Sequence, residues 1–510
     1  MKKSLDRIAH YVAYAYIIIP FILFFIGWLS PVYACITTGI VLVSAVALIK
    51  DTKEFIGIDL SGKKLKIFLI LFILTVVVFF SGIGSYTFQN EDHQVRSAVM
   101  NDLVNKKWPL MLNNDHKLSP NQGPVTFIYY FIYWLPAAFA GKIFGIKAGY
   151  FCLFLWTLLG MTLTFYFVSR HLKKASVWLL LIFLTFDGLY LHFSFLKMPV
   201  FKAISSDYVT WANDMRLADN IIDGLYWIYN QTVTPWLIAA MLLNKPATRN
   251  ILFLYALCYF HGPFMFIGLF PYVIVILSRQ IKAEHLNSVA QVLRSYFTFQ
   301  NVAGGLTVVL IGFFFLSASP AAEPLRLTHR YWKMYLMFIF AVFGLISLLI
   351  YSKYKKEPFF YITIAICLIL PFTRLGSIQV NTFSTRVALA AQFMLAILVA
   401  RYIFEEKKRM RIAVIAYCCI CSLAAVGDVA RSVIFTVGYW TNREATNKVL
   451  YDRSTIWGPR KAMFPQYTSS QNFLLQNDLQ TLDTTYFGNG PKSIEAQKMD
   501  KFFIKYLQKK

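Results

Sequence analysis

The chain has 510 residues, of which 57% are hydrophobic and only 15% are charged. It carries 50 Lys and Arg against 25 Asp and Glu, so its formal net charge is +25. Soluble domains are normally about a quarter charged, so this composition excludes an ordinary soluble protein. Lys and Arg collect in the cytoplasmic loops of membrane proteins, which explains the basic excess without nucleic acid as a partner.

Apolar runs recur along most of the chain, separated by basic or turn-rich loops. About 20 apolar residues cross a bilayer as one helix. The sequence therefore predicts an all-α polytopic membrane protein with about eleven transmembrane helices. The expected spans lie near residues 10–30, 31–49, 66–85, 148–168, 176–195, 226–243, 301–318, 331–352, 358–371, 387–404 and 412–430.

The basic loops indicate the orientation. Lys2, Lys3 and Arg7 precede the first span, and further lysines fill the loop after the second span. Both segments belong in the cytoplasm, because short cytoplasmic loops are rich in Lys and Arg. If the apolar segment 123–141 crossed the membrane, every later loop would lie on the opposite side from the one that its basic residues indicate. We therefore expect it to lie along the outer interface, where its aromatic residues suit the headgroup region.

The stretch 250–278 presents the same problem, because basic residues stand on both sides of it. His261, Gly262 and Pro263 interrupt it. Proline breaks helices, and non-helical backbone at membrane depth is tolerated where protein buries it. The stretch is therefore expected to form a hairpin of two half-helices.

These assignments divide the chain into a transmembrane domain, residues 1–438, and an extracytoplasmic polar tail, residues 439–510. The composition of the tail fits a small domain as well as an ordered flap. The expected outer loops are residues 86–122, 196–225 and 372–386.

The first outer loop holds the main candidate for catalysis. Glu91, Asp92 and His93 follow directly on a predicted span. The dielectric constant falls sharply at that boundary, so a bound substrate feels a carboxylate there strongly. We expect Asp92 to be the general base with Glu91 as its partner, and His93 and Arg96 to bind substrate.

The residues after Asp92 predict a short amphipathic helix on the membrane surface. Apolar residues recur there at roughly helical spacing until Trp108 and Pro109, and a helix usually ends before proline. Glu91 and Asp92 have a second interpretation, because acidic side chains favour helix N-termini. In that case they only cap the helix.

Asp187 is a second acid, at the outer end of an otherwise apolar span. Ionisable groups at that depth are costly, so a functional site is the default hypothesis. The alternative is structural, a carboxylate that pairs with a nearby Lys or accepts hydrogen bonds from a helix end.

Two further polar motifs are expected on the outer side. Arg374, Asn381 and Arg386 lie in or beside the late loop, and arginine suits phosphate because its donors form a charged fork. Headgroup anchoring or an ion pair with the first loop is the alternative. Asn230 and Gln231 begin a polar helix segment that could bind a sugar or only cap the helix.

These features together resemble the GT-C class of membrane glycosyltransferases, and within it bacterial proteins similar to surface-polysaccharide glycosyltransferases. The segments that carry the resemblance are NEDHQVRSAVMNDLVNKKWP at 90–109, LYWIYNQTVTPWL at 225–237, RLGSIQVNTFSTRVALAAQF at 374–393 and MDKFFIKYL at 499–507. They extend over nearly the whole chain.

The resemblance implies a GT-C-like fold in the cytoplasmic membrane of a bacterium, with the active site on the extracytoplasmic side. It implies inverting-type transfer from a polyprenyl-phosphate-linked sugar to a cell-surface glycan or lipid acceptor. Asp92 matches the outer-loop acidic residue that acts as the base in this class, and Asp187 lies near a second acidic position. Some members bind a divalent metal through two acids, but the second loop here has no D-x-E motif, so metal use stays open.

Two other functions remain open at this point. A polymerase or ligase of lipid-linked polysaccharide would need the same arginines and the same base. A transporter or flippase is favoured by the interrupted stretch 250–278, since broken helices often line substrate paths. The sequence leaves the sugar, the carrier lipid and the oligomeric state undetermined.

Overall fold

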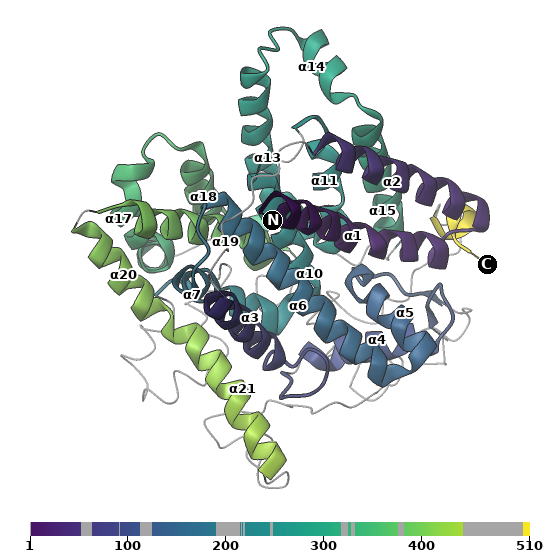
Figure 1. Ribbon diagram of the computed structural model, residues 1–510, viewed down its shortest axis with the longest axis horizontal. Coiled ribbons are helices and arrows are strands. Elements are labelled where there is room, and N and C mark those ends of the chain that lie inside the picture. Colours follow the sequence, from purple (N-terminus) through teal and green to yellow (C-terminus); the bar gives the residue numbers. More distant parts are fainter. Residues whose placement is uncertain are drawn as a thin grey trace.

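The computed structural model (Figure 1) describes residues 2–52, 64–90, 92–112, 125–189, 215, 217, 220–244, 248–317, 325–327, 332–375, 382–407, 409–441 and 503–509. Helices dominate these residues, and their strands form only two short antiparallel pairs. Glu91, Asn381, the second outer loop apart from a few residues, and most of the tail 439–510 lie outside the described residues.

The α-helices are α1 (Lys2–Trp28), α2 (Pro31–Asp51), α3 (Lys64–Phe79), α4 (Asp92–Asn105), α5 (Leu135–Phe144), α6 (Ile146–His171), α7 (Val177–Thr185), α10 (Ile221–Leu243), α11 (Ile251–Ala256), α12 (Cys258–His261), α13 (Pro263–Ala283), α14 (Val289–Tyr296), α15 (Phe299–Leu316), α16 (Trp332–Ile339), α17 (Leu345–Tyr354), α18 (Pro358–Ile369), α19 (Thr382–Glu405), α20 (Met410–Cys421) and α21 (Leu423–Thr441). Shorter 3-10 or π-helical turns are η1 (Ile132–Trp134), η3 (Thr248–Asn250), η4 (Phe340–Gly344), η5 (Leu370–Phe372) and η7 (Phe503–Leu507), and the strands are β1 (Met111–Leu112), β2 (Val125–Thr126), β3 (Leu325–Leu327) and β4 (Thr373–Leu375).

Eight helical stretches of the described chain are long and apolar enough to cross a membrane. Seven coincide with predicted spans, namely α1, α2, α6, α15, α16 with α17, α19, and α20 with α21. The eighth is α13, which the sequence analysis assigned to the hairpin. The all-α polytopic class is confirmed, whereas the count of about eleven is not established.

Four predicted spans fall outside this group for physical reasons. Helix α3 has 16 residues, α7 has 9 and α18 has 12, all shorter than a bilayer crossing. Helix α10 is long enough, with 23 residues, but it carries the polar run Asn230–Thr232. Almost every side chain of α10 is buried, which places this helix at the centre of the bundle against α6, α13 and α19.

The stretch 250–278 is interrupted at the expected place, but its second limb, α13, is long enough to cross a membrane and is not a half-helix. Helices α11 and α12 end at His261, Gly262 is extended, and α13 starts at Pro263. Asn301 ties the start of the hairpin to the segment after it, because its Nδ2 donates to Arg249 O and Tyr296 O. The start of α11 and the segment that follows α13 therefore lie on the same side of the bundle.

The segment 123–141 does not lie along the surface as predicted. Its residues 131–135 are fully buried. Tyr133 donates to Thr157 Oγ1 at 2.8 Å, and Thr157 lies eleven residues into α6, about 16 Å along that helix. The segment enters the bundle and returns through α5, because Tyr and Trp can be buried when their polar atoms find partners. It does not cross, since α5 has only 10 residues.

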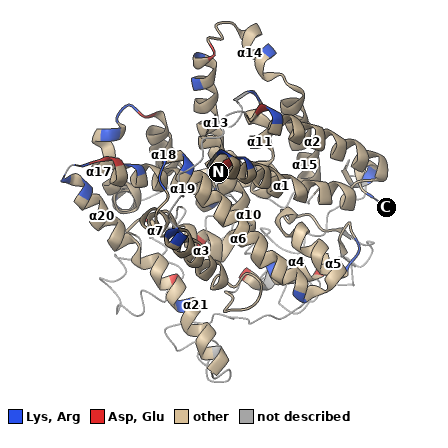
Figure 2. Cartoon of the chain, viewed as in Figure 1, with Lys and Arg blue, Asp and Glu red and all other residues tan. Residues whose placement is uncertain are grey.

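Polar residues mark one end of the bundle, which we call the Asp6 end. Asp6 is fully buried and accepts from Arg170 Nε at 3.0 Å and from Tyr166 OH at 2.7 Å. This joins α1 to the last turn of α6. The same end holds the last turns of α10, α13 and α19, and in Figure 2 many Lys and Arg lie along this margin.

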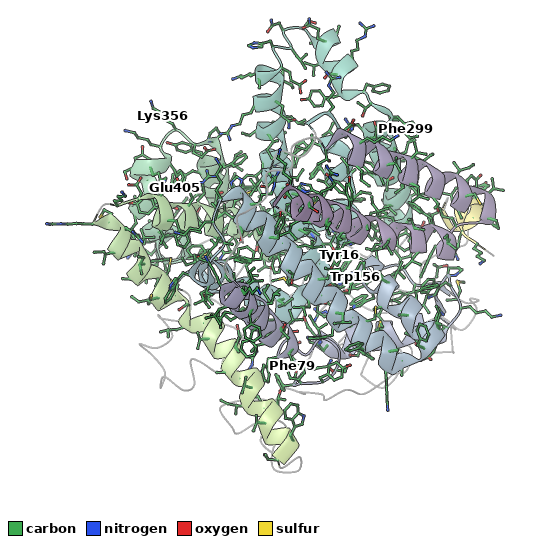
Figure 3. The ribbon with its side chains drawn as sticks, in the orientation of Figure 1. Tyr16, Phe79, Trp156, Phe299, Lys356 and Glu405 are labelled. Carbon is green, nitrogen blue, oxygen red and sulfur yellow. The ribbon has the colours of Figure 1, made fainter. Side chains whose placement is uncertain are left out.

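The opposite end, which we call the α4 end, holds the first turns of α6, α10 and α19. The chain's last described residues also lie there. Ser30 N donates to Leu507 O at 2.9 Å, and Phe503 is fully buried against Phe314. Between the two ends Tyr16 of α1 stacks on Trp156 of α6 at 4.2 Å, near the centre of Figure 3.

Candidate active site

Helix α4 presents the predicted base at its first residue. Asp92 favours this position because a helix N-terminus carries partial positive charge. Arg96 lies one turn later, and its Nη2 donates to Asp92 Oδ2 at 3.0 Å. The Arg96 side chain is 2% exposed and that of Asp92 is 14% exposed. The Asp92 carboxylate makes no other hydrogen bond within the described residues, so its Oδ1 is left open to a ligand.

His93 and Asn90 fix α4 to the central helix. His93 Nε2 donates to the Tyr226 carbonyl at 3.0 Å, and Asn90 Nδ2 donates to the same oxygen at 2.9 Å. Burial and the positive charge of Arg96 lower the pKa of His93 to about 3. The imidazole is therefore neutral, and its role is to position α4 and not to exchange protons.

The Tyr226 carbonyl can accept these bonds because α10 is bent beside it. Ile228 has non-helical angles, with φ −142° and ψ 34°. A bend at this point removes the i to i+4 bond that would occupy the Tyr226 carbonyl. Thr232 Oγ1 donates to the Ile228 carbonyl at 3.2 Å and so satisfies another group at the bend.

The residues that follow the bend carry the predicted amides. Asn230 is fully buried, and neither Nδ2 nor Oδ1 has a hydrogen-bond partner among the described residues. Gln231 Nε2 is likewise buried without one. An unpaired buried amide costs about 1–3 kcal/mol, so these groups are suited to a bound ligand with several hydroxyls.

Arg386 reaches the same place from the first turns of α19. Its Nη1 donates to Gln231 Oε1 at 3.0 Å and to Tyr130 OH at 2.8 Å. The guanidinium also lies 5.9 Å from the centre of the Phe264 ring, on the first turn of α13. The structure thus brings one predicted arginine to the predicted amides.

The residues around Asp92 and those around Arg386 are linked through α10 and through Tyr129. Arg96 lies 5.7 Å from the centre of the Tyr229 ring, next to Asn230 and Gln231 in α10. Tyr129 stacks against Tyr130 at 3.9 Å, and the positive charges of both Arg96 and Arg386 act on its hydroxyl. Two guanidinium groups and two tyrosines form a cluster with the donors that phosphate prefers.

The other two late-loop residues are not placed at this cluster. Arg374 lies in β4, where its backbone pairs opposite Arg326 of β3, and its side chain lies outside the described residues. Asn381 lies outside them as well.

Asp187 is buried and accepts two hydrogen bonds close to the start of α10. Its Oδ1 accepts from Gly188 N at 2.7 Å, and its Oδ2 accepts from Asn220 Nδ2 at 2.9 Å. Asn220 Oδ1 in turn accepts from Asp223 N and caps α10. Asp187 therefore supports the start of the helix that carries Asn230 and Gln231.

Sequence analysis missed a charged pair on α21. Asp428 and Arg431 lie 3.4 Å apart and are largely buried, and the Asp428 charge acts on the Tyr226 hydroxyl. The next turns of α21 contact the first loop, where Thr436 Oγ1 accepts from Phe88 N at 2.9 Å. The sequence could have revealed this pair, because two ionisable residues three positions apart in an apolar helix indicate a functional or paired site.

A divalent metal has no ligand set in the described part of the chain. There, no group of three or more His, Cys, Asp or Glu side chains is arranged to hold an ion. Asp92 is already paired with Arg96, which competes with a cation for the carboxylate.

Comparison of the chain with protein-family models, curated proteins and solved structures finds no match.

Proposed function

We propose that the protein transfers a glycosyl group from a polyprenyl-phosphate-linked donor to a cell-surface glycan or lipid acceptor. The observation that carries the proposal is the position of Asp92. Its carboxylate is partly exposed and held by the buried Arg96, and the charges of Arg96 and of a second guanidinium, Arg386, both act on the hydroxyl of Tyr129. A base beside an anion site is what this reaction requires.

In the proposed reaction Asp92 Oδ1 takes the proton of an acceptor hydroxyl. The hydroxyl oxygen forms the new bond to the anomeric carbon, and the bond from that carbon to the phosphate oxygen breaks. The phosphate leaves with the electron pair, on the opposite side of the sugar ring, which inverts the configuration. Arg386 and the Tyr130 hydroxyl would stabilise the leaving phosphate, and the Arg96 ion pair orients the base.

The amides of α10 supply a place for the sugar. Asn230 and Gln231 retain free donor or acceptor atoms next to Arg386. A sugar ring presents several hydroxyls, and each could satisfy one buried amide atom. Loss of these amides should therefore weaken donor binding more than it slows the chemical step.

We also propose that the α4 end faces the extracytoplasmic side of a bacterial cytoplasmic membrane. The support is the basic residues of the opposite end, among them Lys353 in the last turn of α17, Lys355 and Lys356 after it, and Arg409 and Arg411 at α20. Such clusters favour the cytoplasm. Cysteine labelling at Lys356 and at Tyr86, both on exposed positions, would test this orientation from each side.

The test of the reaction is Asp92→Asn in isolated membranes supplied with a radiolabelled polyprenyl-phosphate sugar. We expect transfer to fall by about 10²–10⁴-fold, the usual contribution of a positioned base. Asp102→Asn is the matched control, because Asp102 lies on the same helix and pairs with Lys106 at the same i,i+4 spacing. Full activity in Asp92→Asn at equal protein level would refute the assignment.

A transporter or flippase is the second candidate, and the meeting of two interrupted helices favours it. Gly262, between α12 and α13, packs against the Gln231 carbonyl and Pro235 of the bent α10. Broken helices that meet often line a substrate path. Reconstituted vesicles would separate the two functions, because a flippase moves the labelled lipid across the bilayer without forming a glycosylated product. A polymerase or ligase would instead yield products of many lengths.

A further inference from the structure

A cavity lies at the Asp6 end, and neither Asp92 nor any other residue of the candidate site lines it. Its volume is about 360 Å³, and the last turns of α6, α10, α13 and α19 and the first turn of α18 surround it. Apolar side chains, among them Leu242, Ile276 and Ile397, line one part of the cavity. The polar part is lined by Arg401, Gln280, Arg279, Glu284 and Glu357. The size is that of pockets for small ligands, and the lining is suited to an amphipathic molecule.

Among the described residues, no carboxylate lies within hydrogen-bond distance of the Arg401 guanidinium. Its Nη2 donates to His171 Nε2 at 2.8 Å. His171 Nδ1 in turn donates to the Leu243 carbonyl at 3.0 Å, so the imidazole is a neutral acceptor. The nearest paired carboxylate is Glu405 at 3.7 Å, whose side chain is 54% exposed. Such exposed pairs bind weakly.

Gln280 adds a buried donor that lacks a partner. The residue is 6% exposed, and its Oε1 accepts from Tyr296 OH at 3.4 Å. Its Nε2 has no hydrogen-bond partner among the described residues. The other arginine of the cavity, Arg279, is already paired with Glu357 at 2.6 Å. Arg401 and Gln280 are thus the donors that remain for an anionic group.

We propose that this cavity binds the phosphate headgroup of a membrane lipid. Arg401 and Gln280 Nε2 donate to the phosphate oxygens, and an acyl chain lies along Leu242, Ile276 and Ile397. The position supports a lipid as the source of the phosphate, because these residues lie where candidate spans end. Basic pockets between helix ends at that depth bind lipid headgroups. This inference does not depend on the proposed glycosyl transfer.

The experiment is native mass spectrometry of the full chain in detergent, titrated with phosphatidylglycerol. A glycosyl diacylglycerol with the same acyl chains serves as the lipid without phosphate, and glycerol 3-phosphate serves as the phosphate without chains. The variants are Arg401→Gln and Gln280→Leu. Lys356→Gln is the control, since Lys356 is exposed at the same end and does not line the cavity (Figure 3).

We expect phosphatidylglycerol to bind and the glycosyl lipid not to bind at the same concentrations. The apparent Kd should rise at least about tenfold in Arg401→Gln, because a charge-assisted hydrogen bond is lost, and should be unchanged in Lys356→Gln. Displacement by glycerol 3-phosphate would identify free phosphate as the ligand instead of lipid. Equal binding of both lipids, or wild-type affinity in both cavity variants with unchanged melting temperature, would overturn the proposal.

Discussion

Arg386 and Gln231 are joined by a hydrogen bond of 3.0 Å between the first turns of α19 and the middle of α10. The same nitrogen donates to Tyr130 at 2.8 Å. Three segments that are distant in the sequence therefore meet at one guanidinium, which is held in place before any ligand binds. Such preorganised donors contribute most to stabilising charge that develops during a reaction.

Replacing Arg386 should accordingly reduce turnover without unfolding the protein. For Arg386→Gln we expect a loss of about 10²–10³-fold in the initial rate of glycosyl transfer. Arg386→Lys should restore only part of it, because the ammonium group cannot bind two oxygens as a fork. Arg294→Gln on α14 is the control, because it also removes an arginine but at an exposed position, and it should leave the rate unchanged. An unchanged rate in Arg386→Gln would remove Arg386 from the proposed site.

The stability of the protein should depend on pH through His93. Its pKa is about 3 in the folded protein and near 6.5 in an unfolded chain. Between these values the unfolded state binds more protons, so the free energy of unfolding falls as the pH drops below about 6.5. His93 alone should contribute roughly 2 kcal/mol to the loss between about pH 7.5 and pH 5.

His93→Gln tests this by removing the titrating group while keeping an amide donor near the Tyr226 carbonyl. The difference in melting temperature between the two pH values should shrink in this variant. It should persist in His285→Asn, which replaces an exposed histidine with a residue that tolerates its φ of 52°. If the His93 variant kept the full pH dependence, other groups would have to account for it.

Gly262→Ala should destabilise the hairpin. A Cβ at Gly262 would lie 2.7 Å from the Gln231 carbonyl oxygen and 2.8 Å from Pro235 Cγ, and the backbone oxygen cannot move aside easily. Overpacking of this kind costs about 1–3 kcal/mol. Gly305→Ala is the matched control, because a Cβ there meets nothing within 4 Å and alanine favours helix. Thermal unfolding in detergent should show a lower melting temperature only for Gly262→Ala.

Phe503→Ala should release the end of the chain from the α4 end. Phe503 is fully buried, with its ring 5.1 Å from that of Phe314 and 6.4 Å from that of Phe24. Removing a buried aromatic ring costs about 3–5 kcal/mol. Tyr506→Ala removes a ring that is 54% exposed and should have little effect. Faster limited proteolysis in Phe503→Ala is the measurement, and equal rates for the two variants would contradict the packing role.

The sequence predicted those features that depend on neighbours along the chain. Asp92 begins a helix, as its acid and the apolar spacing after it indicate. The hairpin breaks at Gly262 and Pro263, because these residues disfavour helix wherever they stand. Local polarity in otherwise apolar surroundings also drew attention to Asn230 and Gln231 as one motif and to Arg386 as part of another, but not to their contact.

What the sequence could not predict are contacts between distant segments. Nothing near His93 indicates that it bonds to the Tyr226 carbonyl, because that oxygen is free only where α10 bends. The burial of residues 131–135 depends on partners in α6 and α10. The same aromatic pattern suits a membrane interface equally well, so composition alone favoured the wrong location.

The bend at Ile228 has a consequence for how α4 and α19 are placed. The part of α10 before the bend holds α4 through the Tyr226 carbonyl, and the part after it holds Arg386 through Gln231. The bend angle of one helix therefore sets the distance from the proposed base to the proposed anion site. A substitution that straightened α10 would shift the two groups relative to each other without touching either of them.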